Sequence, residues 1–338
     1  MKIFYKCFAL LSILLYSCSK DSNTLLEPAD KDIYVCGSEL NSSDKYIAKY
    51  WKNGIETILS DGKNNAFARS IKVVGNDIFI SGEESNGRNA IAKYWKNGQS
   101  FNLTDGKFYS SANKLAIKNS DVYIVGLERN GIIDVAKYWK NGVPFELGDG
   151  KVDSYAFDIK IIENDIYILG LDGTEIVYWK NGIRTKILDS PISRISTKSL
   201  SIEGNDIYVA GSGYEVNQNG YFAKYWKNGV STSLTDEKYY SEVFDIKIKD
   251  KNVYTVGYQF DGIRNVPKYW KNGNSILLTV SRNNSSRANS IETSENDIYI
   301  CGIERVGLNN VVKVWKNGME SNLTDGKYDA MAFSIFVK

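Results

Sequence analysis

The feature that most constrains this sequence is a six-residue block, KYWKNG, that occurs seven times with small changes. It is first seen at residues 49–54, and the last copy at 313–318 carries Val314 in place of tyrosine. Every tryptophan of the chain stands in one of these copies, at positions 51, 95, 139, 179, 226, 270 and 315. Successive copies are 40 to 47 residues apart. This period indicates one supersecondary unit per repeat, with each unit packed against its neighbours.

Each repeat contains four short runs of β-branched and aromatic residues. Residues 70–73 are typical of the first run and 77–82 of the second, while the KYW stretch forms the third and residues 103–106 close the fourth. Their alternation indicates half-buried strands. The Lys-Asn-Gly between the third and fourth runs supplies the positive φ angles that a tight hairpin needs. Each repeat is therefore predicted to be a four-stranded antiparallel meander, and the fold to be all-β.

The two ends of the repeat region complete one another. Residues 32–37 form a second-type strand with no first strand before it, and residues 332–337 form a first-type strand with no second strand after it. A ring pairs these two fragments and leaves no open sheet edge, which a linear array cannot do. The sequence thus predicts a seven-bladed β-propeller over residues 31–338, with one blade built from both chain ends.

The N-terminal residues have the pattern of an export signal. A short basic stretch precedes an apolar run, residues 7–16, that is too short to span a bilayer as a helix. The run ends at Leu-Tyr-Ser-Cys18, which resembles the lipobox of bacterial lipoproteins. This resemblance implies that residues 1–17 are a signal peptide, that Cys18 is acylated, as with palmitate, and that residues 18–30 are a lipid-anchored tether. We expect anchoring in the cell envelope, at the outer membrane; the alternative is an ordinary signal peptide with an incidental cysteine.

The repeat itself also resembles a known family. An Ile-Tyr-Val-x-Gly strand followed by a Tyr-Trp strand, as at residues 33–37 and 50–51, is similar to kelch-type propeller blades, and the similarity extends over residues 31–338. The double glycine of kelch blades is missing, so the resemblance implies the architecture and no partners. The YWKNG and LTDG repeats also resemble those of uncharacterised bacterial lipoproteins, which implies no activity.

Composition excludes several function classes. The chain has no histidine, which removes Ser-His-Asp and Cys-His catalysis and histidine-ligated zinc. Lysine and arginine number 42 against 40 aspartates and glutamates, and the lysines recur evenly, so no clustered basic face for nucleic acid is indicated. We expect no cofactor, no metal and no nucleic-acid partner.

Several repeated residues have structural interpretations. The tryptophans recur at one position of every blade and are expected to pack between blades. The Asp-Gly-Lys stretches are turn signals rather than a calcium ladder, because a lysine follows each carboxylate; the aspartates are Asp61, Asp105, Asp149 and Asp325. Cys36 and Cys301 occupy one strand position in neighbouring blades. Packed sheets lie too far apart for a disulfide, so we expect two buried free thiols.

The candidate binding residues lie in the loops that vary between repeats. In a meander the second-to-third loops and the blade-to-blade loops emerge on the same face, and loops on a rigid scaffold commonly carry recognition. Tyrosine and arginine are frequent anchors of protein contacts. The candidate ligand-binding residues are Phe67, Tyr109, Tyr155, Tyr240, Tyr328, Arg129, Arg264 and Arg305. The alternative is that loop tyrosines only cap the blade ends.

Three functions remain open at this point. The first is a non-enzymatic binding or scaffold module, a monomeric propeller on the cell envelope that presents one face to a protein or glycan. The second is a carboxylate-dependent glycan hydrolase or lyase using Asp158, Asp245 and Glu242, predicted near the mouth-side end of the inner strands. The third is a structural role in an envelope assembly.

Overall fold

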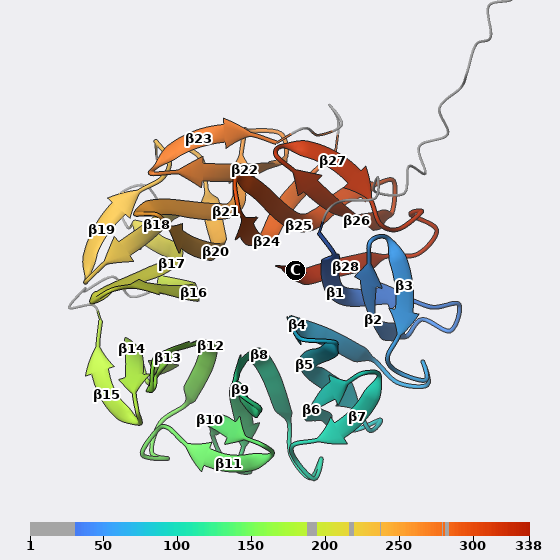
Figure 1. The fold of residues 1–338 in the computed structure, drawn as a ribbon, viewed down its shortest axis with the longest axis vertical. Helices are drawn as coiled ribbons and strands as arrows, with labels where there is room; N and C mark the ends of the chain where they lie inside the picture. Colours follow the sequence, from blue (N-terminus) through green and yellow to red (C-terminus); the bar gives the residue numbers. More distant parts are fainter. Residues whose placement is uncertain (1–30, 188–194, 216–219, 237, 279, 281–283) are drawn as a thin grey trace, which may run out of the picture.

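The computed structural model describes residues 31–187, 195–215, 220–236, 238–278, 280 and 284–338, and the regular elements in these ranges are β-strands. They form seven four-stranded sheets arranged as a ring (Figure 1). All pairings between neighbouring strands of a blade are antiparallel, as at β4–β5 and β5–β6. The predicted seven-bladed β-propeller is therefore confirmed. Within the described ranges no helix has the length and apolar character needed to cross a membrane.

The strands of each blade are taken from the centre of the ring outward. The inner strands are β28 (Ala330–Val337), β4 (Ala66–Val74), β8 (Ser110–Lys118), β12 (Ser154–Ile162), β16 (Ile195–Glu203), β20 (Ser241–Lys249) and β24 (Ser286–Ser294). The second strands are β1 (Ile33–Leu40), β5 (Asp77–Ser85), β9 (Asp121–Arg129), β13 (Asp165–Asp172), β17 (Asp206–Glu215), β21 (Asn252–Phe260) and β25 (Asp297–Val306). The third strands are β2 (Tyr46–Lys52), β6 (Ala90–Lys96), β10 (Asp134–Lys140), β14 (Glu175–Lys180), β18 (Gly220–Lys227), β22 (Asn265–Lys271) and β26 (Asn309–Lys316). The outer strands are β3 (Ile55–Ile58), β7 (Gln99–Asn102), β11 (Val143–Glu146), β15 (Ile183–Lys186), β19 (Val230–Ser233), β23 (Asn274–Leu277) and β27 (Met319–Asn322).

The ring closes where the two ends of the repeat region meet. β28 pairs with β1, with Ile33 opposite Val337 and Cys36 opposite Ser334. Backbone hydrogen bonds between Asp32 and Lys338 in both directions, at 3.0 and 2.9 Å, extend this pairing by one residue. The first blade is thus β28, β1, β2 and β3, as the complementary ends predicted, and the blades are numbered onward in chain order.

The repeated KNG and Asp-Ile-Tyr stretches bind each other within a blade. Asn53 adopts a positive φ of 51° in the turn, and its Oδ1 accepts the Ile33 N–H at 2.8 Å. The Asn53 amide donates to Asp32 at 2.7 Å, and Lys52 forms an ion pair with the same carboxylate. These turns lie at the end of the ring that also carries the hairpins between first and second strands, which we call the hairpin face. The opposite end, with the second-to-third loops and the blade connections, is the loop face.

Each inner strand contains a bulge at one position, which the sequence analysis did not predict. In β4, Ala68 pairs with Gly82 and Ser70 with Ser81, so Arg69 is the extra residue. The bulge brings the Phe67 carbonyl oxygen within 1.9 Å of where a Cβ on Gly82 would lie. Only glycine fits there, which explains the glycine that ends every second-strand repeat.

The tryptophans fill the spaces between blades, as expected. Trp95 of the second blade lies in one cluster with Tyr34 and Cys36 of the first blade and with Ile71 of its own. All seven tryptophans are at most 3% exposed. Cys36 and Cys301 are buried free thiols, also as expected, and burial raises the pKa of Cys36 to about 12.

Candidate functional site

The predicted ligand-binding residues all belong to the loop face, but several of them are engaged with neighbouring residues there. Between the third and fourth blades, Tyr155 donates its hydroxyl to Asp134 at 3.0 Å, and Arg129 donates to the same side chain at 3.2 Å. Phe67 packs against Tyr46 with ring centroids 5.3 Å apart. These contacts hold the ends of neighbouring blades together, which is the capping role that the sequence left open.

Tyr109 and Tyr328 stand apart from these pairs. Tyr109 is 44% exposed ahead of β8, and burial of its remaining surface raises its pKa. Tyr328 is half-buried and lies under the Lys327 ammonium, 5.2 Å from the ring centroid to Nζ. These two tyrosines therefore lie at different blade junctions, and they do not form a common site.

Three predicted residues, Tyr240, Arg264 and Arg305, lie at the junction of the sixth and seventh blades, and Arg305 is the one that lines a pocket there. A pocket of about 240 Å³ opens there, which we call the interblade pocket. Tyr240 donates its hydroxyl to Asn265 in the pocket wall at 3.3 Å, and Arg264 donates to the Asn284 carbonyl at 3.4 Å. The pocket is lined by Asn265, Ser285, Ser286, Arg287, Ile303, Arg305 and Asn310. It is a place on the loop face where a candidate residue lines a pocket.

Ser286 in this pocket has lost the partner that its counterparts keep. In other blades the serine that begins the inner strand accepts a backbone N–H from the third strand of the preceding blade, as Ser110 does from Ala92 and Ser241 from Ala223, at 2.8 and 2.9 Å. The equivalent donor for Ser286 would be residue 267, which is proline and has no N–H. The Ser286 hydroxyl is buried and has no hydrogen-bond partner within the described residues.

Arg287 presents a second unsatisfied donor at the same pocket. Its Nε is buried without a hydrogen-bond partner in the described part of the chain, and its guanidinium lies 5.9 Å from the Phe244 ring centroid. Burial lowers the pKa of Arg287, and the nearby Tyr258 and Glu242 oppose that shift. Buried polar groups are almost always bonded, so two orphaned donors in one pocket need an explanation. The sequence analysis missed both residues, although proline in place of alanine at position 267 was the available signal.

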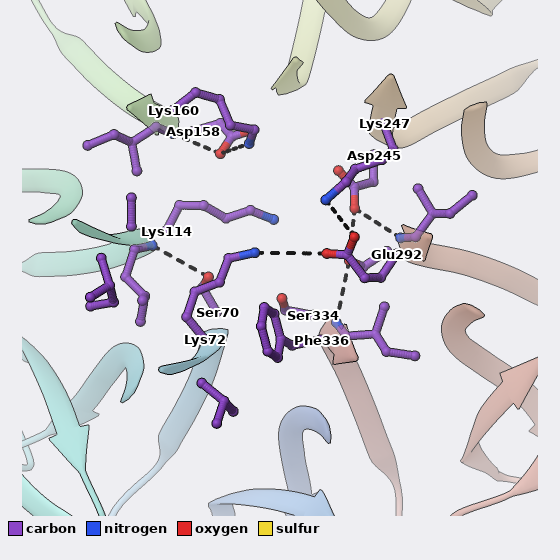
Figure 2. Close-up of a pocket in the computed structure, with 18 of the residues that line it drawn as sticks. Ser70, Lys72, Lys114, Asp158, Lys160, Asp245, Lys247, Glu292, Ser334 and Phe336 are labelled. Atoms are coloured by element: carbon purple, nitrogen blue, oxygen red, sulfur yellow. Dashed lines mark hydrogen bonds and ion pairs between the residues drawn. The ribbon is translucent and has the colours of Figure 1, made fainter. Parts of the chain in front are cut away.

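A second, larger cavity of about 330 Å³ lies in the channel at the centre of the ring (Figure 2). Its lining comes from the halves of β4, β8, β12, β20, β24 and β28 that run toward the hairpin face, so the cavity is not on the side that the loop argument favoured. Four lysines and three carboxylates line it, namely Lys72, Lys114, Lys160, Lys247, Asp158, Asp245 and Glu292. We call it the channel cavity.

The two aspartates proposed for hydrolysis do meet in this channel. The Ser199 hydroxyl lies 3.0 Å from an Asp158 oxygen and 2.7 Å from an Asp245 oxygen. Both aspartates sit in the middle of their strands rather than near the mouth-side end, and each follows the bulge of its strand. Glu242, three residues before Asp245, does not line the cavity. The predicted three-carboxylate group is therefore reduced to a pair.

This pair is already occupied by structural hydrogen bonds. Asp158 accepts the backbone N–H groups of Ile159 and Leu200, both at 2.8 Å, and binds Lys160. Although burial opposes the shift, Lys160 and Lys114 hold the pKa of Asp158 below its ordinary value. A general acid requires a raised pKa, so the geometry gives Asp158 the properties of a structural carboxylate.

The Asp-Gly aspartates close turns. Asp61 accepts the Lys63 N–H at 3.0 Å and pairs with the Lys63 ammonium, and Asp149 binds Lys151 in the same way. Asp105 and Asp325 likewise accept the N–H two residues on. Within the residues that the structure describes, no three cysteine or carboxylate side chains gather as a metal site would require.

Comparison with known proteins identifies the fold. No family model matches the chain, and no curated protein matches its sequence. Among solved structures it is similar to the acylaminoacyl peptidase of Pyrococcus horikoshii, at 15% identity over 90% of this chain and 54% of that one, with a TM-score of 0.55. It is also similar to the β-propeller domain of the trilobed protease of Pyrococcus furiosus, at 15% identity over 88% of this chain and 95% of that one, with a TM-score of 0.55.

These similarities establish a β-propeller and no activity. The chain spans about half the length of the peptidase it matches, so the similarity is confined to part of that enzyme. The trilobed protease propeller is described as having an open velcro topology, whereas here β1 and β28 pair and close the ring. The kelch resemblance and the lipid anchor stay predictions, and Cys18 lies outside the described residues.

Proposed function

We propose that this protein is the non-enzymatic binding module of an envelope lipoprotein, and that it holds a protein or glycan on its loop face. The ligand presents a carboxylate to the interblade pocket. The protein is anchored through Cys18, acts as a monomeric ring, and uses its closed sheet system as a rigid scaffold for the loops.

The single observation that carries this proposal is the pair of orphaned donors in the interblade pocket. Among the residues that the structure describes, neither Arg287 Nε nor the Ser286 hydroxyl has a hydrogen-bond partner, and both residues line the pocket together with Arg305. A planar carboxylate satisfies a guanidinium with two parallel hydrogen bonds and accepts a further bond from a hydroxyl. A ligand of this kind provides acceptors for both groups and so offsets the cost of burying them.

The surroundings of the pocket favour a macromolecular ligand. Ile263 and Leu308, on the loops beside it, are 88% and 86% exposed. Aliphatic side chains at the tips of two adjacent loops provide apolar contact area around a polar centre, which is the usual composition of a recognition surface. Tyr240 stacks on Phe260 at 4.6 Å, so its ring is held in place before binding.

The proposed lipid anchor would leave the loop face accessible to a ligand. Lys31, the first described residue, forms an ion pair with Glu295 at 2.6 Å in a hairpin of the seventh blade. The tether therefore joins the propeller at the hairpin face. With a lipid on Cys18, the hairpin face is directed toward the membrane and the loop face away from it.

The proposal is tested with carboxylate-bearing polymers. Purified protein is passed over immobilised polyglucuronate, polyglutamate and neutral dextran, and retention is measured by surface plasmon resonance. We expect binding to at least one of the two anionic polymers and none to dextran. Arg287→Gln should weaken that binding at least tenfold.

The matched control is Arg129→Gln, which removes an arginine of the same face whose guanidinium is held by Asp134 and by the Ile132 carbonyl. It should bind as the wild type does. Equal binding by Arg287→Gln and the wild type, or binding to dextran alone, would remove the interblade pocket from the proposal. The hydrolase alternative is the weaker one, because Asp158 is engaged in structural hydrogen bonds and its pKa is lowered.

A further inference from the structure

The channel cavity is lined by one lysine, Lys114, whose position the packing of the blades does not explain. Ser70 and Ser290 occupy the ring position that follows the bulge, and each accepts a backbone N–H from the next blade, from Leu115 at 3.4 Å and from Ile335 at 3.5 Å. In the third blade this position is Lys114, which has no acceptor to offer. The Ile159 N–H of the next blade bonds instead to its own neighbour, Asp158, at 2.8 Å. A lysine at this position therefore removes one link between blades.

Lys114 is also without a direct partner. Its side chain extends from β8 toward the middle of the channel (Figure 2), and no hydrogen bond or ion pair joins its Nζ to another of the described residues. Burial tends to lower its pKa, but the Asp245 and Asp158 carboxylates act on it through space and raise the pKa overall. Lys114 is thus a charged ammonium with open hydrogen-bonding capacity inside a cavity.

A second ammonium in the cavity is only weakly held. Lys72 lies 4.0 Å from Glu292, and that carboxylate is already bound by Lys247 at 2.6 Å. A third of the Lys72 side chain, 35%, is exposed to the cavity. Because Lys72 and Lys114 come from β4 and β8, the inner strands of adjacent blades, both ammonium groups face the same part of the channel (Figure 2).

The chemistry of the wall selects the class of anion. The cationic groups are lysines, and none of the described arginines lines the cavity. Arginine forks suit planar carboxylates, whereas ammonium groups act as point charges that converge on the oxygens of a tetrahedral anion. Four lysines against three carboxylates leave one net positive charge in the cavity wall. The carboxylates are bound to Lys160, Lys247, serine hydroxyls and backbone N–H groups, so Lys114 and Lys72 are the ammonium groups left to contact an anion. The volume of about 330 Å³ is that of a small-molecule site.

We propose that the channel cavity binds a small phosphate-bearing anion, a phosphomonoester or pyrophosphate, through Lys114 and Lys72. The site is entered from the hairpin face, on the opposite side of the ring from the interblade pocket. It is therefore independent of the proposed loop-face function, and either one can fail without the other.

Calorimetric titration with pyrophosphate and with inorganic phosphate tests this site. Pyrophosphate should bind the wild-type protein, and Lys114→Met should weaken binding at least tenfold. Lys114→Arg, which keeps the charge, should bind within a few-fold of the wild type. The control is Lys118→Met, four residues along the same strand, whose ammonium is bound to Asn164 at 2.8 Å at the rim; it should leave the affinity unchanged.

Folding of each variant is followed by thermal unfolding, with and without pyrophosphate. Ligand should raise the melting temperature of the wild type and of Lys118→Met but not of Lys114→Met, since only a bound anion stabilises the folded state. Absence of wild-type binding, or equal binding by Lys114→Met, would overturn the site. Tighter binding of citrate than of pyrophosphate would overturn the assignment to phosphate.

Discussion

The Leu200 backbone N–H donates to the Asp158 carboxylate across the boundary between the fourth and fifth blades, at 2.8 Å. The same arrangement recurs where Ile291 donates to Asp245 between the sixth and seventh blades, at 3.0 Å. The bulge makes it possible, because it directs the following side chain into the channel and toward the next inner strand. The carboxylates of the channel thus link neighbouring blades.

Replacing Asp158 with alanine should destabilise the protein by about 3 kcal/mol, because two backbone N–H groups and the Lys160 ammonium lose a fully buried acceptor. Urea unfolding followed by tryptophan fluorescence measures the difference. Asp61→Ala, in an exposed turn, serves as the control and should unfold as the wild type does. An unchanged midpoint for Asp158→Ala would show that the inter-blade link is dispensable.

The same carboxylate predicts a pH dependence. The folded pKa of Asp158 is lowered, so its contribution to stability is complete above the unfolded value of about 3.9 and is lost as pH falls through the folded value. The stability difference between the wild type and Asp158→Ala should therefore shrink below pH 4. A difference that stays constant down to pH 2 would contradict a lowered pKa.

The sequence predicted those features that depend on local residue choice or on the repeat itself. The turn at Asn53 needs a residue tolerant of positive φ, and the burial of Trp51 follows from its recurrence in every blade. The pairing of Ile33 with Val337 followed from the complementary ends. Each of these is visible without knowing which residues face the channel.

The bulge could not be predicted in this way, and the site depends on it. One extra residue, such as Arg69, reverses which side chains point inward, so a simple alternation places the channel residues incorrectly. The roles proposed for Lys114 and Arg287 depend on residues of the adjacent blades, which the sequence of a single repeat does not show. The second-strand glycine was a readable signal, because a glycine inside a strand often marks a bulge or a close backbone approach.

Gly82→Ala should destabilise the second blade severely, by more than about 3 kcal/mol, because its Cβ would lie 1.9 Å from the Phe67 carbonyl oxygen. Gly75→Asn provides the comparison. That glycine has a φ of 57° and open space around it, which asparagine tolerates at little cost. Thermal unfolding of both variants distinguishes them; equal melting temperatures would argue against the tight approach at the bulge.

Pro267 and Ser286 should show a coupling that a double-mutant cycle detects. Pro267→Ala restores an N–H that Ser286 can accept, as Ser110 accepts that of Ala92. The stability change on Pro267→Ala should be more favourable by about 1 kcal/mol with Ser286 present than in the Ser286→Ala background. A coupling energy of zero in urea unfolding would mean that the missing N–H does not orphan the hydroxyl.

Lys72 should titrate well below the ordinary value of a lysine. Burial lowers its pKa to about 8, partly opposed by Glu292, while Lys247, Lys160 and Lys114 lower it further. Since the folded pKa lies below the unfolded one, stability should rise with pH between about 8 and 10.5. Titration of ¹³C-methylated lysines by NMR measures the value, and Glu292→Gln should lower it. A resonance assigned to Lys72 that titrates near 10.5 would contradict this description of the cavity.

The loop face is the proposed ligand-binding surface of this protein. A photo-crosslinking amino acid at position 263, beside the interblade pocket, tests this in intact cells. Its matched control is position 55 on the hairpin-face side of the outer strands; the two isoleucines are 88% and 70% exposed. The account predicts a crosslinked partner from position 263 and none from position 55. A partner captured from position 55 alone would contradict it.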